Sequence, residues 1–183
     1  LITSSAASDV YKRQVEPYGF PSPQSIEMIE RAKDLGMQVN SSHFTWDSLL
    51  NPHTKGILPF AEVLATAQKY NLTDLVVPYL HNEDRKDLTA YKKTAEKLNQ
   101  GAEEASKVGI RLAYHNHAFE FKPLSKDKTG YDIFVESFSS EMYFEVDVFW
   151  VKLGGVEPNA LLKKLNKRVS QLHLKDLQKG SVC

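Results

Sequence analysis

Cysteine is nearly absent from the sequence, since Cys183, the last residue, is the only one. Its scarcity excludes a disulfide framework, a cysteine-based metal site and a thiol nucleophile in the body of the chain. The composition is compatible with a reducing compartment, and we expect a cytoplasmic protein.

The sequence also lacks an excess of charge of either sign and has no long apolar run. Lysine and arginine together number 23, as do aspartate and glutamate, so the formal net charge is zero. Binding to nucleic acid or to an anionic membrane usually needs a broad positive surface, which this balance does not predict. No apolar run approaches the roughly 20 residues of a membrane span. We therefore expect a small-molecule ligand and neither a nucleic acid nor a membrane partner; a homo-oligomer is compatible with the sequence.

The first 14 residues, LITSSAASDVYKRQ, are rich in serine and alanine and have no hydrophobic period. The stretch from Asp9 to Gln14 resembles the translation of an adapter carried into assembled metagenomic reading frames. We expect 1–14 to be non-native, with a disordered tail as the alternative, and we assign 15–183 to one domain. A non-native start would place the natural N-terminus, with any signal peptide, outside the printed sequence.

The sequence has instead a regular alternation of short apolar runs and longer helical patterns, which is typical of β/α units around a parallel sheet. Strands are predicted at 15–20, 37–44, 74–80, 110–117, 142–150 and 169–177, and helices at about 22–36, 58–71, 87–108, 130–139 and 157–167. This series fits an open doubly wound sheet or a (β/α)8 TIM barrel.

The α/β barrel is favoured because polar residues recur inside the strands and no glycine-rich dinucleotide loop follows any strand. A complete barrel typically needs about 250 residues. We therefore expect an incomplete barrel of about six β/α units, without the first strand and the last one or two units.

Alternation along the later strands sorts their side chains into two faces. The helix-facing set is predicted to include Met142, Phe144, Val146, Leu172 and Leu174. The opposite face receives His115, Asp147 and His173, each near the C-terminal end of its strand, where barrel active sites are built.

Burying these three groups is costly unless they are paired or bind a cation. Two imidazoles with one carboxylate favour manganese, cobalt, zinc or iron over calcium, and magnesium stays an open alternative. A single inward histidine is more often an ordinary core residue, so the metal hypothesis depends on the convergence of three groups.

Four segments give the chain a resemblance to a known family. They are VEPYG at 15–19, LAYHNHAFEF at 112–121, FEVDVFWV at 144–151 with the GG and EP that follow, and RVSQLHLKDL at 168–177. In this order they resemble the xylose-isomerase-like sugar phosphate isomerases and epimerases, in the superfamily of the AP endonucleases of family 2. The resemblance covers essentially all of 15–178 and implies a TIM barrel with a metal held on its fifth to eighth strands.

The resemblance places Asp147 at the sixth-strand ligand position and His173 at the seventh. Many members have ENH where this chain has HNH, so His115 stands at the place of the usual glutamate. The resemblance therefore implies either a histidine ligand there or a Glu120 that loops back to the metal. The eighth-strand glutamate has no counterpart in the printed chain, which implies weak metal binding and an inactive fragment as one outcome.

The activity that the resemblance implies is metal-dependent isomerisation or epimerisation of a sugar, sugar phosphate or keto-sugar, by proton transfer next to a carbonyl through an enediolate. Glu120 or Glu145 is the expected base. Lys175 is expected to stabilise negative charge, with an ion pair to Asp176 as an equal alternative. A keto-sugar lyase or an inosose-type dehydratase on the same site is the main alternative; an endonuclease IV-like nuclease and a non-catalytic carbohydrate-binding barrel are less favoured.

Aromatic and imidazole side chains near strand ends are the candidates for sugar contact. They are His43, His81, His117 and Trp150, with Trp46 as a further candidate. For each of them, packing or loop structure is at least as good an explanation.

Overall fold

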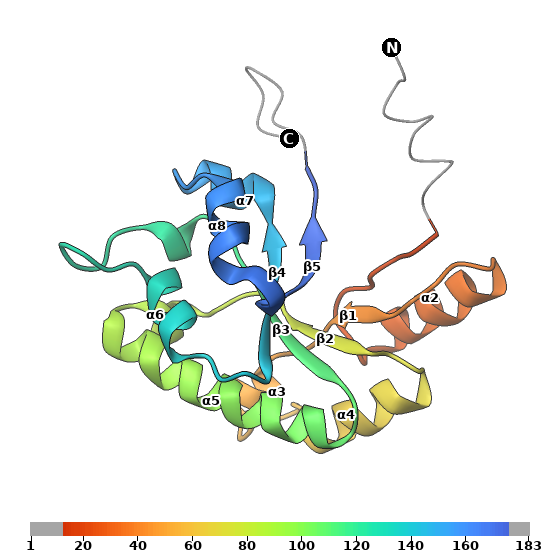
Figure 1. Cartoon of the computed structure of the whole chain (residues 1–183). Helices are drawn as coiled ribbons and strands as arrows, with labels where there is room; N and C mark the ends of the chain where they lie inside the picture. The colour runs from red at the N-terminus through yellow and green to blue at the C-terminus, as the bar shows by residue number, and fades with distance from the viewer. Residues whose placement is uncertain (1–12, 176–183) are drawn as a thin grey trace, which may run out of the picture.

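A computed structural model describes residues 13–175 and contains one parallel sheet of five strands in sequence order. The strands are β1 (Ser41–His43), β2 (Asp74–Val77), β3 (Arg111–His115), β4 (Met142–Asp147) and β5 (Val169–His173). Each strand pairs in parallel with the next one along the chain, and the sheet curls into half a barrel (Figure 1). Because a doubly wound sheet would reverse its strand order, the sequential order confirms the prediction of an incomplete TIM barrel.

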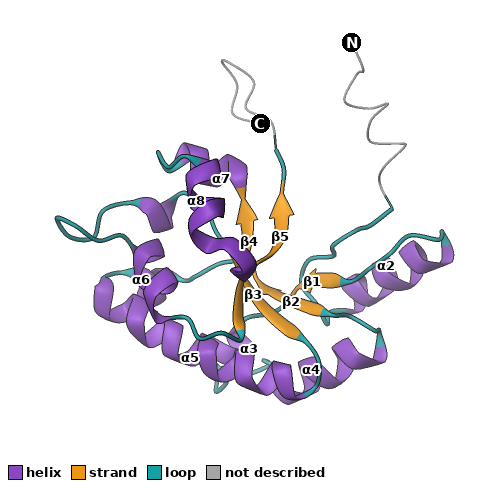
Figure 2. Cartoon of the chain, viewed as in Figure 1, coloured by secondary structure: helices purple, strands orange, loops and turns teal. Residues whose placement is uncertain are grey.

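Helices connect the strands and cover the outer face of the curled sheet (Figure 2). The longer ones are α2 (Pro23–Asp34), α4 (Phe60–Lys69), α5 (Leu88–Lys107), α6 (Gly130–Ser137) and α8 (Pro158–Leu165). The shorter ones are α3 (Asp47–Leu50), α7 (Val148–Leu153) and the 3-10 turns η1 (Asn82–Arg85), η2 (Phe119–Phe121) and η3 (Asn166–Arg168). No helix among residues 13–175 is long and apolar enough to cross a membrane.

Local signals in the sequence explain where the helices begin. The Ser22 hydroxyl accepts a hydrogen bond from the Ser25 backbone at the start of α2, where Pro23 occupies the first helical position. Thr129 and Asp132 form a reciprocal capping box at α6. The capped helices pack their apolar faces on the sheet and form one core with its outward side chains.

The segment at 15–20 is not the regular strand that the sequence predicts. It runs beside β1 and pairs through isolated parallel bridges, Gln14 with Gln38 and Phe20 with Phe44. Pro17 lies in this segment and has no N–H to donate to a ladder, although its carbonyl accepts from the His43 backbone. The prediction of six strands is therefore wrong: the described residues form five strands and one loosely paired segment.

β5 is the last strand of the described sheet, and two leucines in and after it are exposed to solvent instead of packed under a helix. Leu172 and Leu174, which were predicted to face helices, are 45% and 77% exposed. Within 13–175, no helix that follows β5 covers them. The helix-facing prediction is confirmed on the inner strand β4, where Met142, Phe144 and Val146 are completely buried.

Candidate functional site

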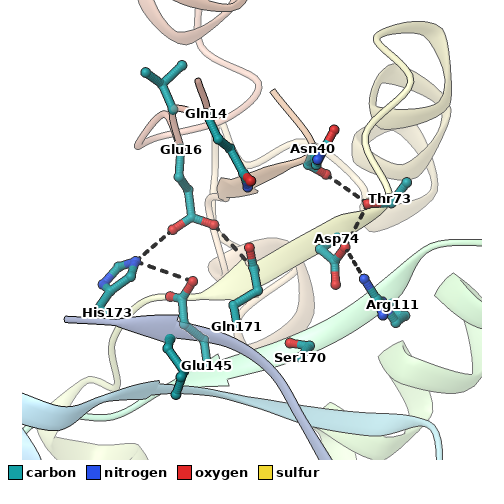
Figure 3. A pocket seen from close by; sticks show the side chains of 12 residues that line it. Gln14, Glu16, Asn40, Thr73, Asp74, Arg111, Glu145, Ser170, Gln171 and His173 are labelled. Atoms are coloured by element: carbon teal, nitrogen blue, oxygen red, sulfur yellow. Dashed lines mark hydrogen bonds and ion pairs between the residues drawn. The ribbon is translucent and has the colours of Figure 1, made fainter. Parts of the chain in front are cut away.

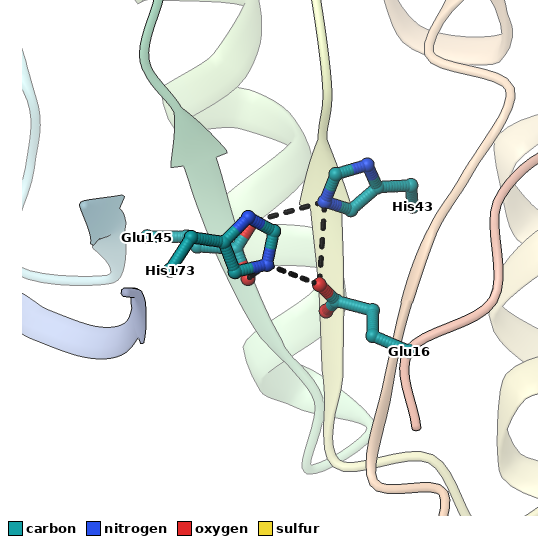
Figure 4. Close-up of side chains that lie close together, drawn as sticks. All are labelled: Glu16, His43, Glu145 and His173. Carbon is teal, nitrogen blue, oxygen red and sulfur yellow. Dashed lines mark hydrogen bonds and ion pairs between the residues drawn. The ribbon is translucent and has the colours of Figure 1, made fainter. Parts of the chain in front are cut away.

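Titratable side chains from five segments converge inside the half-barrel, near the C-terminal ends of the strands. Two groups have donor atoms close enough to hold a metal ion. The first, called the tetrad below, contains Glu16, His43, Glu145 and His173 (Figure 4). The second, called the triad, contains His115, Asp147 and His173. His173 on the edge strand belongs to both groups.

The tetrad alternates carboxylates and imidazoles around a common centre. His43 Nε2 lies 2.9 Å from Glu145 Oε2 and 3.3 Å from Glu16 Oε2. His173 Nε2 lies 3.0 Å from Glu16 Oε2 and 3.3 Å from Glu145 Oε1. Figure 4 shows all four side chains pointing toward one another. The segment at 15–20 and the strands β1, β4 and β5 each supply one member.

The triad is built around one oxygen of Asp147. Its Oδ1 caps helix α7 by accepting hydrogen bonds from the Phe149 and Trp150 backbones, at 3.1 and 3.2 Å. Its Oδ2 faces the interior, 3.4 Å from His115 Nε2 and 3.8 Å from His173 Nδ1. The cap fixes the carboxylate, so Oδ2 is held at the end of β4 where a cation can meet it.

Lys175 supplies a cation at that same oxygen. Its Nζ lies 2.6 Å from Asp147 Oδ2, and its side chain is half exposed. The predicted alternative, a pairing of Lys175 with Asp176, falls partly outside the described residues.

Opposite charges set the ionisation of these groups. Burial lowers the pKa of His43, but hydrogen bonds to Glu145 and Glu16 outweigh it and raise the pKa to about 9. Hydrogen bonds to Asp147, Glu145 and Glu16 raise the pKa of His173 to about 11. Burial raises the pKa of Glu16, but the hydrogen bonds from the two histidines outweigh it and hold this pKa far below its usual range. Without a cation between them, the carboxylates therefore keep both imidazoles protonated.

The residues of both groups fit a divalent ion. Imidazole nitrogens with carboxylate oxygens are the donors that zinc, manganese, cobalt and iron accept. Two buried atoms, Glu145 Oε1 and His115 Nδ1, have no hydrogen-bond partner among the described residues. Buried polar atoms usually find a partner, so such atoms beside an ion-binding group need a reason.

Glu120 does not join either group. Its carboxylate is completely buried and accepts hydrogen bonds from Tyr114 Oη at 2.7 Å and from the His117 backbone at 2.9 Å. Tyr114 contacts Phe134 of helix α6 on the outer side of β3, opposite to the neighbouring His115. The turn η2 therefore carries Glu120 away from the interior, and burial raises its pKa to about 7.

The predicted sugar-contacting residues lie in two different places. His43 is a tetrad member. The others form a curved row of rings after the strand ends, called the ring arc below. The ring centroids of His117 and Trp150 lie 5.4 Å apart, and those of Trp46 and His81 lie 5.3 Å apart. Tyr79 connects the two pairs, with ring centroids 5.3 Å from His117 and 6.3 Å from Trp46. Tyr79 was not predicted, although it also follows a strand, β2.

A polar cavity of about 460 Å³ adjoins the tetrad. It runs from Glu16, Glu145 and His173 toward the first residues of β2 and β3, where Asp74 pairs with Arg111 at 2.8 Å (Figure 3).

Glu16 is the tetrad member that the sequence prediction missed. It lies in VEPYG, a segment that was noted for its resemblance and not for its carboxylate. Its position in a segment predicted as the end of a strand was the available signal, because alternate side chains of a strand point inward.

Comparison with known proteins supports the fold. No protein-family model matches the sequence, and no curated protein sequence matches it significantly. Among solved structures, a sugar phosphate isomerase/epimerase from Parabacteroides distasonis superposes with a TM-score of 0.74 at 21% identity, over 93% of this chain and 70% of that one. A second from the same organism has a TM-score of 0.70 at 25% identity, over 89% of this chain and 64% of that one.

Similar structures carry several activities on this fold. D-psicose 3-epimerase from Clostridium cellulolyticum, solved with D-tagatose, has a TM-score of 0.61 at 13% identity, over 91% of this chain and 64% of that one. Others are described as an AP endonuclease of family 2 and a probable 3-DHS dehydratase. The resemblance to xylose-isomerase-like barrels is thus confirmed in structure, and the chain spans about two thirds of the length of these proteins.

Proposed function

We propose that the protein is a metal-dependent sugar isomerase or epimerase that moves a proton next to a carbonyl group. The observation that carries the proposal is the buried Asp147 carboxylate, whose Oδ1 is fixed by a helix cap while Oδ2 faces two imidazoles. Similar structures described as sugar isomerases and epimerases support it. Such barrels place their active sites at this end of the strands.

The proposed ligands of the triad are His115, Asp147 and His173. A bound divalent ion would polarise a sugar carbonyl and stabilise the negative charge that proton removal leaves. Asp147 is kept in position by the cap of α7, and His115 is held rigidly because it is 4% exposed.

Glu145 is the better placed of the two predicted bases. It is buried at the centre of the site, and the one ion-pair contact of its Oε1 within the described part of the chain is a long one, 3.3 Å to His173 Nε2, so a lone pair is available for a proton. Its Oε2 is held by His43 at 2.9 Å. Glu120, with both oxygens bonded on the other side of β3, is less suited to the role. A base must come within hydrogen-bond reach of the proton that it accepts.

Lys175 and the ring arc complete the proposed roles. The half-exposed ammonium at Asp147 can turn toward a developing negative charge on the substrate. His117, Trp150 and His81 form walls that are suited to the apolar face of a sugar ring, which is the proposed substrate class.

Solvent deuterium exchange tests this proposal most sensitively, because it registers proton removal even when net turnover is slow. The chain is incubated in D2O with Mn²⁺ or Co²⁺ and a panel of ketoses, including D-psicose, D-tagatose and D-fructose, and the carbon next to the carbonyl is followed by NMR. Exchange by the parent chain that is lost in Asp147→Asn supports the proposal. No exchange with any ketose, or equal exchange by Asp147→Asn, would contradict it.

A lyase or dehydratase acting on the same site is the second candidate, because removal of the same proton with a leaving group on the next carbon gives elimination. The similar structure described as a probable 3-DHS dehydratase favours keeping it. A 3-keto-glycoside distinguishes the two: an unsaturated product with release of the aglycone indicates a lyase, and a rearranged sugar indicates an isomerase.

A further inference from the structure

We propose that the tetrad of Glu16, His43, Glu145 and His173 is a metal position in its own right, complete without His115 and Asp147. It is a four-ligand site for a transition-metal dication such as Zn²⁺ or Co²⁺. The inference concerns metal binding alone, so it does not depend on the proposed activity.

The spacing of the donor atoms is that of a tetrahedral ion. At metal–ligand distances of about 2.0–2.1 Å, neighbouring ligands of a tetrahedral zinc lie about 3.3 Å apart. The nitrogen–oxygen separations around the tetrad are 2.9, 3.0, 3.3 and 3.3 Å. Glu145 makes its two contacts through different oxygens, Oε2 toward His43 and Oε1 toward His173, and one donor atom from each of the four residues lies within 4.8 Å of the others.

The tetrad is enclosed but has an approach from solvent. The side chain of Glu145 is fully buried, those of Glu16 and His43 are 14% exposed, and that of His173 is 29% exposed. The polar cavity of about 460 Å³ opens directly beside Glu16, Glu145 and His173 (Figure 3). Ions can enter by this route, as a binding site requires.

Charge balance and the free oxygen of Glu145 also point to an ion. Two carboxylates, two neutral imidazoles and one dication sum to zero, which removes the cost of burying unpaired charge. Glu145 Oε2 faces His43 and Oε1 faces His173 at 3.3 Å, and Oε1 has no hydrogen-bond partner in the described chain, so an ion between the two imidazoles would give it one.

The tetrad is a stronger candidate for the first ion than the triad. At the triad, an ion must displace the Lys175 ammonium, which lies 2.6 Å from Asp147 Oδ2. His173 directs Nε2 to the tetrad and Nδ1 toward Asp147, 3.8 Å away. Nε2 therefore makes the closer contacts of His173, and those contacts belong to the tetrad.

Titration of the metal-free chain with CoCl2 and ZnCl2 tests the assignment. Tetrahedral Co²⁺ absorbs visible light more strongly than six-coordinate Co²⁺, so the spectrum reports the geometry while dialysis reports the stoichiometry. Glu16→Gln and His43→Gln affect only the tetrad, and His115→Gln and Asp147→Asn affect only the triad. Glu157→Gln and His53→Gln are matched exposed controls outside both groups.

We expect an intense tetrahedral Co²⁺ spectrum in the parent chain. Glu16→Gln and His43→Gln should each weaken this binding by at least roughly tenfold, since even residues that only orient ligands contribute about 10- to 100-fold. Asp147→Asn and His115→Gln should keep the tetrahedral spectrum. Circular dichroism identifies any variant that fails to fold, and in that case His43→Asn or Glu16→Ala replaces it.

Three results would overturn the proposal. They are a parent chain that binds neither ion above the level of a denatured sample, a Co²⁺ spectrum without tetrahedral intensity, or binding that survives Glu16→Gln and His43→Gln unchanged but is lost in Asp147→Asn. Tetrahedral binding without deuterium exchange would count against the proposed activity and leave the metal position standing.

Discussion

The side-chain amide of Asn116 holds the backbone of Asp147. Asn116 Oδ1 accepts a hydrogen bond from the Asp147 N–H at 3.0 Å, and Asn116 Nδ2 donates to the Asp147 carbonyl at 3.2 Å. Both residues are completely buried. The middle residue of HNH thus fixes the end of β4 from the end of β3, while His115 beside it faces the interior.

Replacing Asn116 with alanine should cost about 2 kcal/mol or more of unfolding free energy, because two buried backbone groups lose their partners at about 1–3 kcal/mol each. Affinity for a second equivalent of Co²⁺, bound at the triad, should fall with it, because Asp147 is no longer fixed. Urea denaturation and Co²⁺ titration measure the two effects.

Asn99 offers a matched control, because its amide makes the same kind of bridge, to the Ser137 carbonyl and the Ser139 N–H, at 2.8 and 2.9 Å. Asn99→Ala should reduce stability and leave metal affinity unchanged. Equal losses of metal affinity in the two variants would contradict a specific role for Asn116.

Glu120 should make the protein less stable as pH rises from about 4.5 to about 7. Burial raises its pKa in the folded state to about 7, above the 4.5 of the unfolded chain. The folded state therefore binds more protons in this window, and the unfolding free energy falls with pH, by on the order of 3 kcal/mol in total at 1.4 kcal/mol per unit.

Glu120→Gln removes this titration. Urea denaturation at pH 5 and pH 8 should show a smaller fall in stability for the variant than for the parent chain. An identical pH dependence in the two proteins would show that Glu120 titrates normally.

Much of the site could be predicted because strand alternation decides which face a side chain takes. Asp147 and His115 are inward and buried as the alternation requires, and helix α5 begins and ends within one residue of its predicted limits. Alternation gives no information on what happens after a strand ends. Trp150 therefore lies in helix α7 and not in a longer strand, and Glu120 turns back beneath β3.

The sequence also could not predict which residues far apart in the chain lie side by side in space. Glu16 and His173 are 157 positions apart and 3.0 Å apart in space, and only the curvature of the sheet brings them together. The position of β5 at the edge of the sheet likewise explains why Leu172 is exposed, although strand alternation predicted that its side chain faces a helix.

Lys175→Gln should separate metal binding from catalysis. Removing the ammonium beside Asp147 takes away a cation that competes with a metal ion for Oδ2, so affinity for a second equivalent of Mn²⁺ should rise severalfold. Deuterium exchange should nevertheless fall, because the substrate loses a stabilising positive charge. Lower metal affinity in the variant would contradict the competition.

Trp150→Ala should raise the sugar concentration needed for half-maximal exchange, with little effect on metal affinity, because its ring lies beside His117 in the arc and outside both metal groups. Trp150→Phe should restore most of the sugar affinity by keeping a flat apolar wall. If alanine and phenylalanine variants bind sugar as the parent does, the ring arc is a packing feature and not a sugar site.

Crystals of the chain grown with Zn²⁺ and measured at the zinc absorption edge test the central claim most directly, which is that the converging strand ends bind a metal ion. We predict an anomalous peak bonded to His173 Nε2, with Glu16, His43 and Glu145 completing its ligands. An anomalous map without a peak at any tetrad or triad residue, at a zinc concentration that saturates binding in solution, would contradict the account.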